Sequence, residues 1–489
     1  MFHRFNIALL ARLCGQLLLV ISLLMAAALA VSLLMADGAA MVLAKSLALT
    51  MLAGLLLRFV FGRKARFELF GRESLWLTSM LWIVVPLFGA LPYWFYGTTH
   101  GVIDAIFESV SGFTTTGASV VQHPEELPAS LLLWRSATQW LGGLGLVLFV
   151  VAANRRMAVG SLQLYDAEFS GTQQRKLHPR IAKSVGRMWR IYTAITLIMV
   201  AAMRTCGCGW VDSFCLSMST VSTGGFVTHC TGLSVLNPSA MAVVVVFMFM
   251  SGLNVAMLYN LLTLRWRQLK HSEEFTVYVV LFAVSVGVCT LSFVLAGNGV
   301  GESAQYSIFH IASTLSTSGF YVAHPQYWSL PVSVFTFLLM FVGAMAGSTG
   351  GGLKILRLMY LLRYLRNYIT RMLHPNVVFS VKVDSRTIAA HYVNKIFAFV
   401  FLYIIFVIAG GFVLTLCGST IPEALSMAAA NMANLGPSPL MDSTGSMPVY
   451  HSLPAVAKCV LMLLMLAGRL EIFALLAIAS PLITHLNRR

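Results

Sequence analysis

Four short stretches rich in Thr, Ser and Gly lie between long apolar segments, where a lipid-exposed backbone would have no hydrogen-bond partners. They are FTTTGAS at 113–119, VSTGGF at 221–226, LSTSGF at 315–320 and ANLGP at 433–437. Non-helical backbone at membrane depth is stable only where protein buries it or where it lines a water-filled cavity. Four such stretches in corresponding places predict one ring of backbone carbonyls around a single axis, which is how a cation filter is built.

The composition places the surrounding chain in a membrane. Of the 489 residues, 58% are hydrophobic and only 10% are charged, and the mean hydropathy is +0.81. Soluble proteins do not have this composition, so we expect an all-α protein that crosses the bilayer many times. Ten spanning helices are predicted near 8–35, 39–60, 75–96, 130–152, 188–206, 238–262, 275–297, 332–362 (interrupted), 394–417 and 456–484.

Four further apolar segments, near 102–113, 211–221, 304–315 and 422–433, are too short to cross a hydrocarbon core. A spanning helix needs about 20 residues, so these segments are predicted to be re-entrant pore helices.

The positions of the charges predict the topology. With the N-terminus inside, most of the 33 Lys and Arg residues fall in cytoplasmic segments, and the outer segments carry acids instead. The positive-inside rule therefore favours a multi-pass protein with both termini in the cytoplasm. The net charge of +16 follows from this asymmetry. It needs no nucleic-acid partner, although the basic loops will attract anionic membrane lipid.

Two features near the predicted outer face and the N-terminus have ordinary explanations. The first apolar segment is far longer than the core of a signal peptide and a second one follows at once, so it is expected to remain as a helix. Four cysteines, Cys206, Cys208, Cys215 and Cys230, lie near the predicted outer face. They could form a disulfide or remain isolated thiols, and their spacing does not indicate a metal site.

The four polar stretches belong to a repeated plan of helix, short helix, polar turn and helix. One glycine aligns each turn, and these anchors are Gly117, Gly225, Gly319 and Gly436. Thirteen residues before them stand Asp104, Asp212, Tyr306 and Glu423. An acid in the first turn of a short helix complements the positive end of its dipole and also concentrates cations at an outer mouth. The negative ends of the four short helices would point towards the axis and favour a cation there.

The predicted organisation has seven segments. They are an N-terminal helical hairpin (1–70), pore repeat 1 (71–160), a cytoplasmic linker (161–187), pore repeat 2 (188–270), pore repeat 3 (271–367), a second linker (368–392) and pore repeat 4 (393–489). The predicted ion-binding filter residues are Thr115, Thr116, Gly117, Thr223, Gly224, Gly225, Thr317, Ser318, Gly319, Asn434, Leu435 and Gly436.

Nearly the whole chain resembles the TrkH/TrkG branch of the Trk/Ktr/HKT potassium transporters. Beyond the four turns, the resemblance rests on GAMAGSTGGGLKILR at 343–357, HPNVVFSVK at 374–382 and GRLEIF at 468–473. It implies a homodimer with one potassium pathway per protomer, gated by a TrkA-like cytoplasmic ring of nucleotide-binding regulatory subunits. It also implies K⁺ selectivity, because Gly117 occupies the position at which sodium-permeable relatives carry serine. The bacterial inner membrane is the expected location.

A glycine-rich segment in the third repeat is the predicted gate. Residues Gly347, Ser348, Thr349, Gly350, Gly351 and Gly352 hold four glycines, each about 1 kcal/mol less favourable than alanine inside a helix. An unwound loop below the filter is therefore expected, and the resemblance assigns it the role of a gate. A phosphate-binding loop is excluded because Lys354 does not follow a glycine and no strand precedes the run. Close helix packing through small residues is the remaining alternative.

Arg469 is the second predicted gate residue. It falls deep in the last predicted span, where a central arginine costs about 2.5–3.5 kcal/mol on insertion scales. We expect it to approach residues 347–352 and to place a positive barrier beneath the filter. Snorkelling, or pairing with acids without a gating role, is the alternative.

The predicted function is potassium uptake through a channel-like pore, driven by the membrane potential and with proton symport left open. The chain itself is expected to bind no cofactor, with K⁺ as the transported ion and any nucleotide on the regulatory partner. Secondary transport of a small solute, or a less selective K⁺/Na⁺ symporter, is the alternative. Catalysis is not expected, because no zinc-protease, nucleophile-elbow or paired-carboxylate motif occurs within the spans.

Overall fold

The fold is almost entirely helical in the computed structural model, which describes residues 7–63, 71–99, 101–146, 181–265, 271–322, 330–374, 381–384, 386–387, 390–437 and 450–478. Within these residues only β1 (Lys382–Val383) and β2 (Arg386–Thr387) are strands, and they pair antiparallel. Six described segments are long and apolar enough to cross a membrane: Ile7–Met35, Ala40–Phe61, Leu75–Tyr96, Val185–Thr205, Glu273–Leu295 and Tyr392–Leu416. The chain is therefore a multi-pass, nearly all-helical membrane protein.

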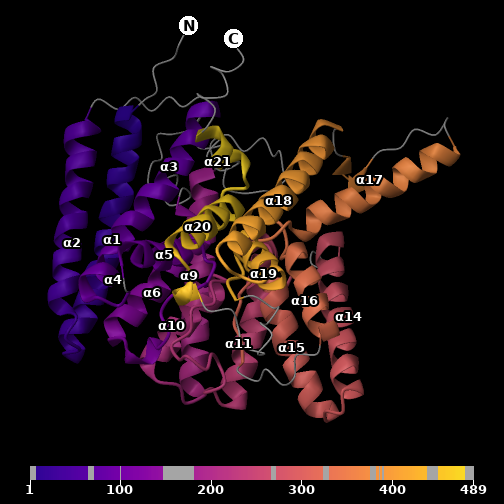
Figure 1. Ribbon diagram of the computed structural model, residues 1–489, viewed down its shortest axis with the longest axis horizontal. Helices are drawn as coiled ribbons and strands as arrows, with labels where there is room; N and C mark the ends of the chain where they lie inside the picture. The colour runs from indigo at the N-terminus through magenta and orange to yellow at the C-terminus, as the bar shows by residue number, and fades with distance from the viewer. Residues whose placement is uncertain are drawn as a thin grey trace, which may run out of the picture.

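Two long helices, α1 (Ile7–Met35) and α2 (Ala40–Leu55), form an antiparallel pair at one edge of the molecule (Figure 1). The end of α2 continues as η1 (Leu56–Phe61), a short π-helical segment. Asp37 organises the turn between the two helices, because its carboxylate accepts hydrogen bonds from the N–H groups of Ala39 at 3.2 Å and Ser130 at 3.0 Å. The turn is thereby attached to the rest of the protein.

After this pair, the described helices follow one order four times: a long helix, a short helix, a polar turn and a helix that stops or breaks. The first unit comprises α3 (Gly71–Gly89), α4 (Leu91–Tyr96), α5 (Val102–Phe113), η2 (Pro124–Glu126) and α6 (Ala129–Gly143). The second comprises α9 (Ile181–Thr205), α10 (Trp210–Val221), α11 (Pro238–Ser251) and α12 (Val255–Leu262). The third comprises α14 (Glu273–Leu295), α15 (Val300–Ser316), α16 (Leu330–Val342) and α17 (Ile355–Leu373). The fourth comprises α18 (Ala390–Leu416), α19 (Ile421–Met432), η4 (Tyr450–Ser452), α20 (Ala455–Arg469) and α21 (Phe473–Ile478).

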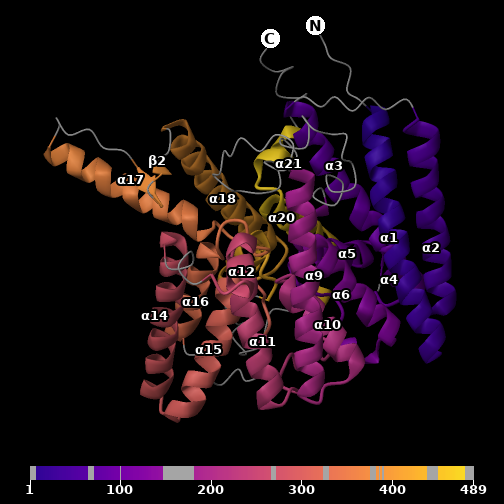
Figure 2. The same cartoon turned by 180° about the vertical axis from the view of Figure 1, so that it is seen from behind.

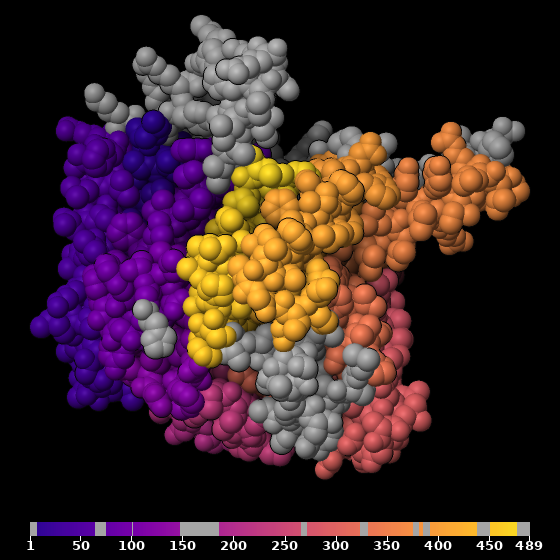
Figure 3. Space-filling model, in the orientation of Figure 1, coloured from indigo at the N-terminus to yellow at the C-terminus, as the bar shows by residue number. Residues whose placement is uncertain are grey.

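Neighbouring units pack against one another in chain order, and the fourth also packs against the first through α20 and α5. The fourth unit lies in front of the second in Figure 1 and behind it in Figure 2. The third unit lies at the edge opposite α1 and α2 when the molecule is seen from either side (Figures 1 and 2). Helix α17 leaves the body of the protein and projects beyond it, as the space-filling view also shows (Figure 3).

The helix that follows each polar turn is interrupted in every unit. Helix α6 ends at Gly143, three residues separate α11 from α12, twelve residues lie between α16 and α17, and three lie between α20 and α21. The interruption predicted at 347–352 is present, and it extends over residues 343–354. The uninterrupted helices predicted at 130–152, 238–262 and 456–484 are wrong.

Local features explain two of the missed breaks. The side chain of Asn254 accepts a hydrogen bond from the N–H of Ala256 at 2.8 Å and thereby caps α12, which lets a new helix begin there. The break after α20 has no glycine at all. Instead, Glu471 and Ile472 adopt left-handed backbone angles, with φ of 56° and 55°. Non-glycine residues rarely accept this conformation, so the sequence carries no local signal for the break.

The third short helix begins earlier than the predicted segment 304–315. Helix α15 starts at Val300, and its first turn therefore contains Glu302 rather than Tyr306. Each of the four short helices consequently has an acid in its first turn: Asp104, Asp212, Glu302 and Glu423. The extra turn places Glu302 four residues before the aligned position, which is why an alignment by fixed spacing missed it.

Most of the predicted linker 161–187 and part of the predicted linker 368–392 lie outside the described residues, as do residues 438–449 after the fourth turn. The predicted limits of the other segments remain predictions.

Candidate ion pathway

Four glycines bring the four polar turns into contact with one another. Gly117, Gly225, Gly319 and Gly436 all have positive φ, between 71° and 86°. A Cβ atom added to any one of them would lie within 2.3 Å of a carbonyl oxygen of another turn. No side chain fits at these positions, and a positive φ disfavours any residue with a Cβ.

The contacts among the glycines close into a ring that follows chain order. The added Cβ of Gly117 would meet the oxygen of Gly224, that of Gly225 the oxygen of Ser318, that of Gly319 the oxygen of Leu435, and that of Gly436 the oxygen of Thr116. The fourth turn thus meets the first, and each contact involves the carbonyl that immediately precedes the next glycine. These contacts bring together the four anchor glycines and the residue before each of them, which are eight of the twelve predicted filter residues.

The backbone of the four turns is also the same. The residue two positions before each glycine is left-handed, with φ between 53° and 59°. These residues are Thr115, Thr223, Thr317 and Asn434. The repeated geometry confirms the alignment of the four glycines, including the fourth turn, whose sequence differs most from the others.

A buried ion pair that sequence reasoning missed lies behind the first two turns. The guanidinium of Arg135 binds the Glu108 carboxylate through Nε at 2.9 Å and Nη2 at 2.7 Å, and both side chains are buried. Arg135 also donates to the carbonyl of Val227 at 3.1 Å, whereas the N–H of Val120 donates to Glu108 at 3.0 Å. The pair therefore joins the segment after the first turn to the segment after the second.

Gln139 supports the second turn directly. Its amide nitrogen donates to the carbonyl of Gly224 at 2.7 Å, and its oxygen accepts from the Ser219 hydroxyl at 2.7 Å and the Phe226 N–H at 3.2 Å. In the fourth turn the hydroxyl of Tyr450 donates to the carbonyl of Gly436 at 2.6 Å. These buried bonds fix the orientation of carbonyls that face the ring.

The loop at 343–354 passes immediately beside the third and fourth turns. An added Cβ on Gly351 would lie 2.0 Å from the carbonyl oxygen of Ala433, and the Gly351 N–H donates to the Thr317 hydroxyl at 2.7 Å. The loop is held from the other side by the Glu274 carboxylate, which accepts from the Ala346 N–H at 2.7 Å. Gly350 and Gly351 of the predicted gate are thus in contact with the third and fourth turns.

Arg469 lies against this loop. Its Nη1 donates to the carbonyl of Thr349 at 2.9 Å, and its Nη2 donates to the carbonyls of Gly142 and Gly143, the latter at 2.7 Å. The arginine therefore connects three of the four helix breaks, those of the first, third and fourth units. Glu471 does not pair with it; this carboxylate binds Arg357 instead, at 2.6 Å.

A second cation, Lys354, stands beside Arg469 and was not among the predicted site residues. Its side chain is only 8% exposed and its ammonium donates to the carbonyl of Gly350. The backbone of Lys354 is left-handed, with φ of 73°. Lys354 lies two residues after the glycine run, where no motif marks it. Its charge inside an apolar segment is the only sequence signal that it belongs to the site.

A cavity of about 50 Å³ lies among these groups. This volume is above the roughly 10–15 Å³ that a cavity needs to hold a water molecule. The cavity is lined by residues of the first, third and fourth helix breaks and by Asn434 of the fourth turn. Arg469 and Lys354 both form part of its wall. A small polar cavity under a ring of carbonyls, with two positive side chains in its wall, can hold water but opposes a cation.

The cysteines near the predicted outer face are free thiols. Cys206, Cys208, Cys215 and Cys230 form no disulfide in the structure. Of the two alternatives left open by the sequence, the structure therefore has the isolated thiols.

Comparisons with known proteins agree on one family. The sequence profile of the family described as "TrkH: Cation transport protein" matches residues 39–484. The "Trk system potassium uptake protein TrkH" of Halomonas elongata is 32% identical over 487 residues, which cover 97% of this chain and 99% of that protein. The protein of the same name from Escherichia coli K12 is 32% identical and covers 92% of this chain and 94% of its own length.

A solved structure has the same fold. The crystal structure of the potassium transporter TrkH from Vibrio parahaemolyticus superposes with a TM-score of 0.88 and 28% sequence identity. The match covers 97% of this chain and 98% of the other.

Proposed function

Because the chain belongs to the TrkH family of cation transport proteins, whose members are transporters and not enzymes, we propose that it takes up potassium through the pathway formed by its four turns. The curated relatives are named as potassium uptake proteins, and they match this chain over nearly its full length. The observation that carries the proposal is the closed ring of glycines.

The ring acts as a selectivity filter in this proposal. Four units of the same plan, each a helix, a re-entrant helix, a turn and a broken helix, surround one axis and together with α1 and α2 form a ten-helix pore protein. Carbonyl oxygens from residues such as Thr116 and Gly224 replace the water of a dehydrating K⁺. The tight contacts between neighbouring turns support a rigid ring, and the hydrogen bonds of Gln139 and Tyr450 oppose its collapse.

The short helices provide the field that attracts the ion. Each runs to a polar turn, so that the negative end of its dipole lies at the ring. The acids at their first turns add negative charge at the other end, which we assign to the outer mouth. Asp104, however, binds Lys458 at 2.6 Å, so its charge is largely neutralised. Asp212, Glu302 and Glu423 are left as the acids that concentrate cations at the outer mouth.

The loop at 343–354 is the proposed gate. Arg469 and Lys354 hold it beneath the ring through backbone carbonyls, and their two charges raise the energy of a cation at this point. Opening would require the loop to move away from Gly142, Gly143 and the ring. Residues after the loop continue directly into α17, so a partner bound to the segment after α17 could pull on the gate.

The proposed assembly is a homodimer in the bacterial inner membrane with a TrkA-like nucleotide-binding subunit on its cytoplasmic side and both termini in the cytoplasm. The exposed apolar side chains along the projecting α17 support contact with a second protein or with lipid. They include Leu362, Leu365, Ile369, Met372 and Leu373. The excess of basic residues in the predicted inner segments supports the orientation.

Ion flux in liposomes tests the filter. Purified protein should admit K⁺ in preference to Na⁺, and Gly117→Ser should reduce the preference because its side chain would displace the carbonyl of Gly224. Gly418→Ser is the matched control, since Gly418 also has a positive φ, 101°, but an added Cβ there meets no atom within 4 Å.

The result that contradicts the proposal is equal loss of selectivity in the two variants, or unchanged selectivity in Gly117→Ser. If the wild-type protein conducts neither ion, the regulatory subunit is added before the same comparison is made. If neither ion is conducted with the subunit bound, the proposal that the four turns form a pore is wrong.

A further inference from the structure

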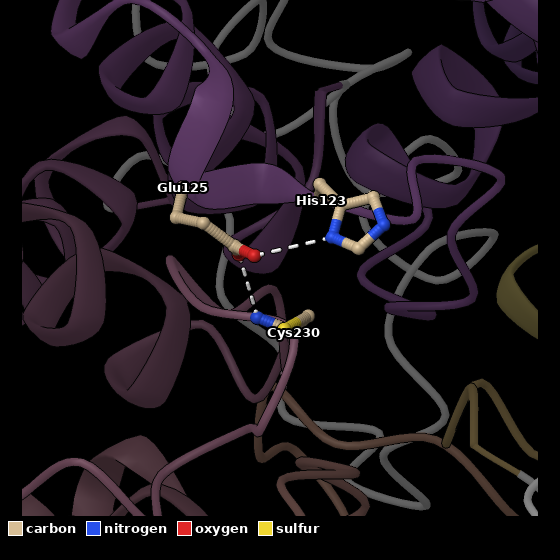
Figure 4. A group of neighbouring side chains, drawn as sticks. All are labelled: His123, Glu125 and Cys230. Carbon is tan, nitrogen blue, oxygen red and sulfur yellow. Dashed lines mark hydrogen bonds and ion pairs between the residues drawn. The ribbon is translucent and has the colours of Figure 1, made fainter.

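Three side chains with metal-binding atoms lie close together in the segments that follow the first and second polar turns (Figure 4). His123 and Glu125 lie between the first turn and α6, and Cys230 lies between the second turn and α11. One ligand atom from each residue lies within 4.8 Å of the others, and all three residues are exposed. The imidazole Nδ1 of His123 is 3.3 Å from the Glu125 carboxylate.

The segments that carry these side chains are joined by the Glu125 carboxylate itself and are further held by the hydroxyl of Tyr321. The N–H of Cys230 donates to Glu125 Oε2 at 2.8 Å, which joins the two segments. The hydroxyl of Tyr321, two residues after Gly319, donates to the carbonyl of Cys230 at 3.0 Å. The cluster is therefore attached to the outer ends of three of the four turns, and the carboxylate is already oriented before any ion binds.

We propose that His123, Glu125 and Cys230 form a binding site for a divalent transition-metal ion of the Zn²⁺ type. A thiolate, an imidazole and a carboxylate are together the ligands that zinc accepts, whereas magnesium and calcium select oxygen ligands. Three protein ligands in exposed segments leave the fourth tetrahedral position to water. On binding, the metal–sulfur bond replaces the S–H bond, and the proton passes to the solvent without any change of oxidation state.

The distances are compatible with this assignment. Bonds of about 2.0–2.3 Å in a tetrahedral site place ligand atoms roughly 3.3–3.7 Å apart. The present separations, up to 4.8 Å, exceed this by at most about 1.5 Å, a change that exposed side chains make by rotation. The site differs in every residue from the filter and from the gate.

Occupancy would change the charge at the outer mouth. Without metal the cluster carries one negative charge on Glu125, and with the metal, the thiolate and a neutral imidazole its net charge is zero. Loss of a negative charge lowers the local concentration of cations and with it the flux of K⁺. This consequence rests on the proposed function, whereas metal binding does not.

Binding is tested on the detergent-solubilised full chain with Cd²⁺ as the probe. Calorimetry should give one high-affinity ion per chain, accompanied by the ultraviolet charge-transfer band of a cadmium thiolate. Cys230→Ser should remove the band, and His123→Ala and Glu125→Gln should each weaken binding at least tenfold. Cys459→Ser is the control, because Cys459 is also an exposed thiol but lies on α20, outside the cluster.

Each result decides between the alternatives. Binding unaffected by Cys230→Ser overturns the site, and binding that depends on Cys230 but not on His123 or Glu125 shows a single reactive thiol and also overturns it. His123→Cys distinguishes the loss of a ligand from the loss of the fold. This variant supplies a second thiolate in place of the imidazole and should retain Cd²⁺ binding. If Cd²⁺ binds to wild-type protein in liposomes without reducing K⁺ flux, the site stands and its effect on the mouth is rejected.

Discussion

Arg469 is hydrogen-bonded to the carbonyl of Thr349 at 2.9 Å, so the last broken helix of the chain is fastened to the loop of the preceding unit. The same guanidinium reaches the first unit through Gly143. One side chain thus restrains three helix breaks that must separate if the cavity beneath the ring is to widen. If residues 343–354 form the gate that we propose, the strength of this restraint should set how readily the pathway opens.

Replacing Arg469 by alanine should increase ion flux in the absence of a regulatory partner. The variant loses hydrogen bonds from a charged donor, each contributing about 1.5–3 kcal/mol, and removes a positive charge from the pathway. A change of only about 1.4 kcal/mol in the opening equilibrium corresponds to a tenfold rise in flux. Flux into liposomes measures it.

Arg204→Ala is the control for the Arg469 variant. Arg204 also donates to a backbone carbonyl, that of Cys208 at 2.7 Å, but at an exposed position outside the cavity. Its flux should equal that of the wild type. A folded Arg469→Ala protein with unchanged or lower flux would show that Arg469 does not restrain the gate.

Glu108→Gln should destabilise the protein strongly. Removing one partner leaves the buried charge of Arg135 without its counter-ion, and such a change costs about 3–5 kcal/mol. Thermal unfolding in detergent measures the loss, with the exposed Glu126→Gln as control. The double variant Glu108→Gln and Arg135→Met should recover much of the stability, and a double variant no better than the single one would argue against a pairwise role.

Gln139→Leu should lower the selectivity for K⁺ over Na⁺ in protein that is still expressed and folded. Leucine has a similar size, but it leaves the carbonyl of Gly224 and the N–H of Phe226 without their partner, so the second turn loses its fixed orientation. Gln139→Glu keeps the acceptor for Phe226 and loses the donor to Gly224, and should give an intermediate value. Competitive ion flux distinguishes the three proteins, and equal selectivity in all of them would contradict the role of Gln139.

Asp37 should make stability depend on pH. Partial burial opposes ionisation, but hydrogen bonds from the Ser32 hydroxyl, from Ser130 and from the Ala39 N–H lower the pKa of Asp37 below its usual value. Its contribution is therefore present above a pH of about 4, the ordinary pKa of aspartate, and is lost as the pH falls through the lowered value. Asp37→Asn should melt at a lower temperature than wild type near pH 7.

The difference between Asp37→Asn and wild type should disappear in acid, since both side chains are then neutral. Glu126→Gln, at an exposed position, should follow the wild-type curve across the whole range. A difference that persists at the lowest pH would mean that the carboxylate charge is not what stabilises the turn between α1 and α2.

The sequence indicates the ring because it depends on a local requirement that only glycine meets. A positive φ and the absence of a Cβ are needed at Gly117 and its three counterparts, and the same residue type therefore recurs at the same place in each unit. Hydropathy likewise locates the long first helix of every unit, although the start of α15 shows that fixed spacing fails when a helix gains one turn.

The breaks and the supporting residues depend on tertiary contacts and leave weaker signals. None of the three residues in the break after α20 is a glycine, and Glu471 instead keeps its unusual backbone while its carboxylate binds Arg357 on α17. Arg135 is a basic residue inside the predicted span 130–152, but its partner Glu108 lies in a separate helix, and no spacing rule joins the two. Lys354 was visible beside the glycine run, yet its burial could only be known from the fold.

The contact between Gly436 and the carbonyl of Thr116 has a consequence for biosynthesis. It joins the last unit to the first, so a nascent chain that has inserted three units has an open arc in place of a ring. If the ring is the filter that we propose, it can form only after the fourth turn has been synthesised. A shorter nascent chain then lacks the complete ring and, with it, the selective pathway.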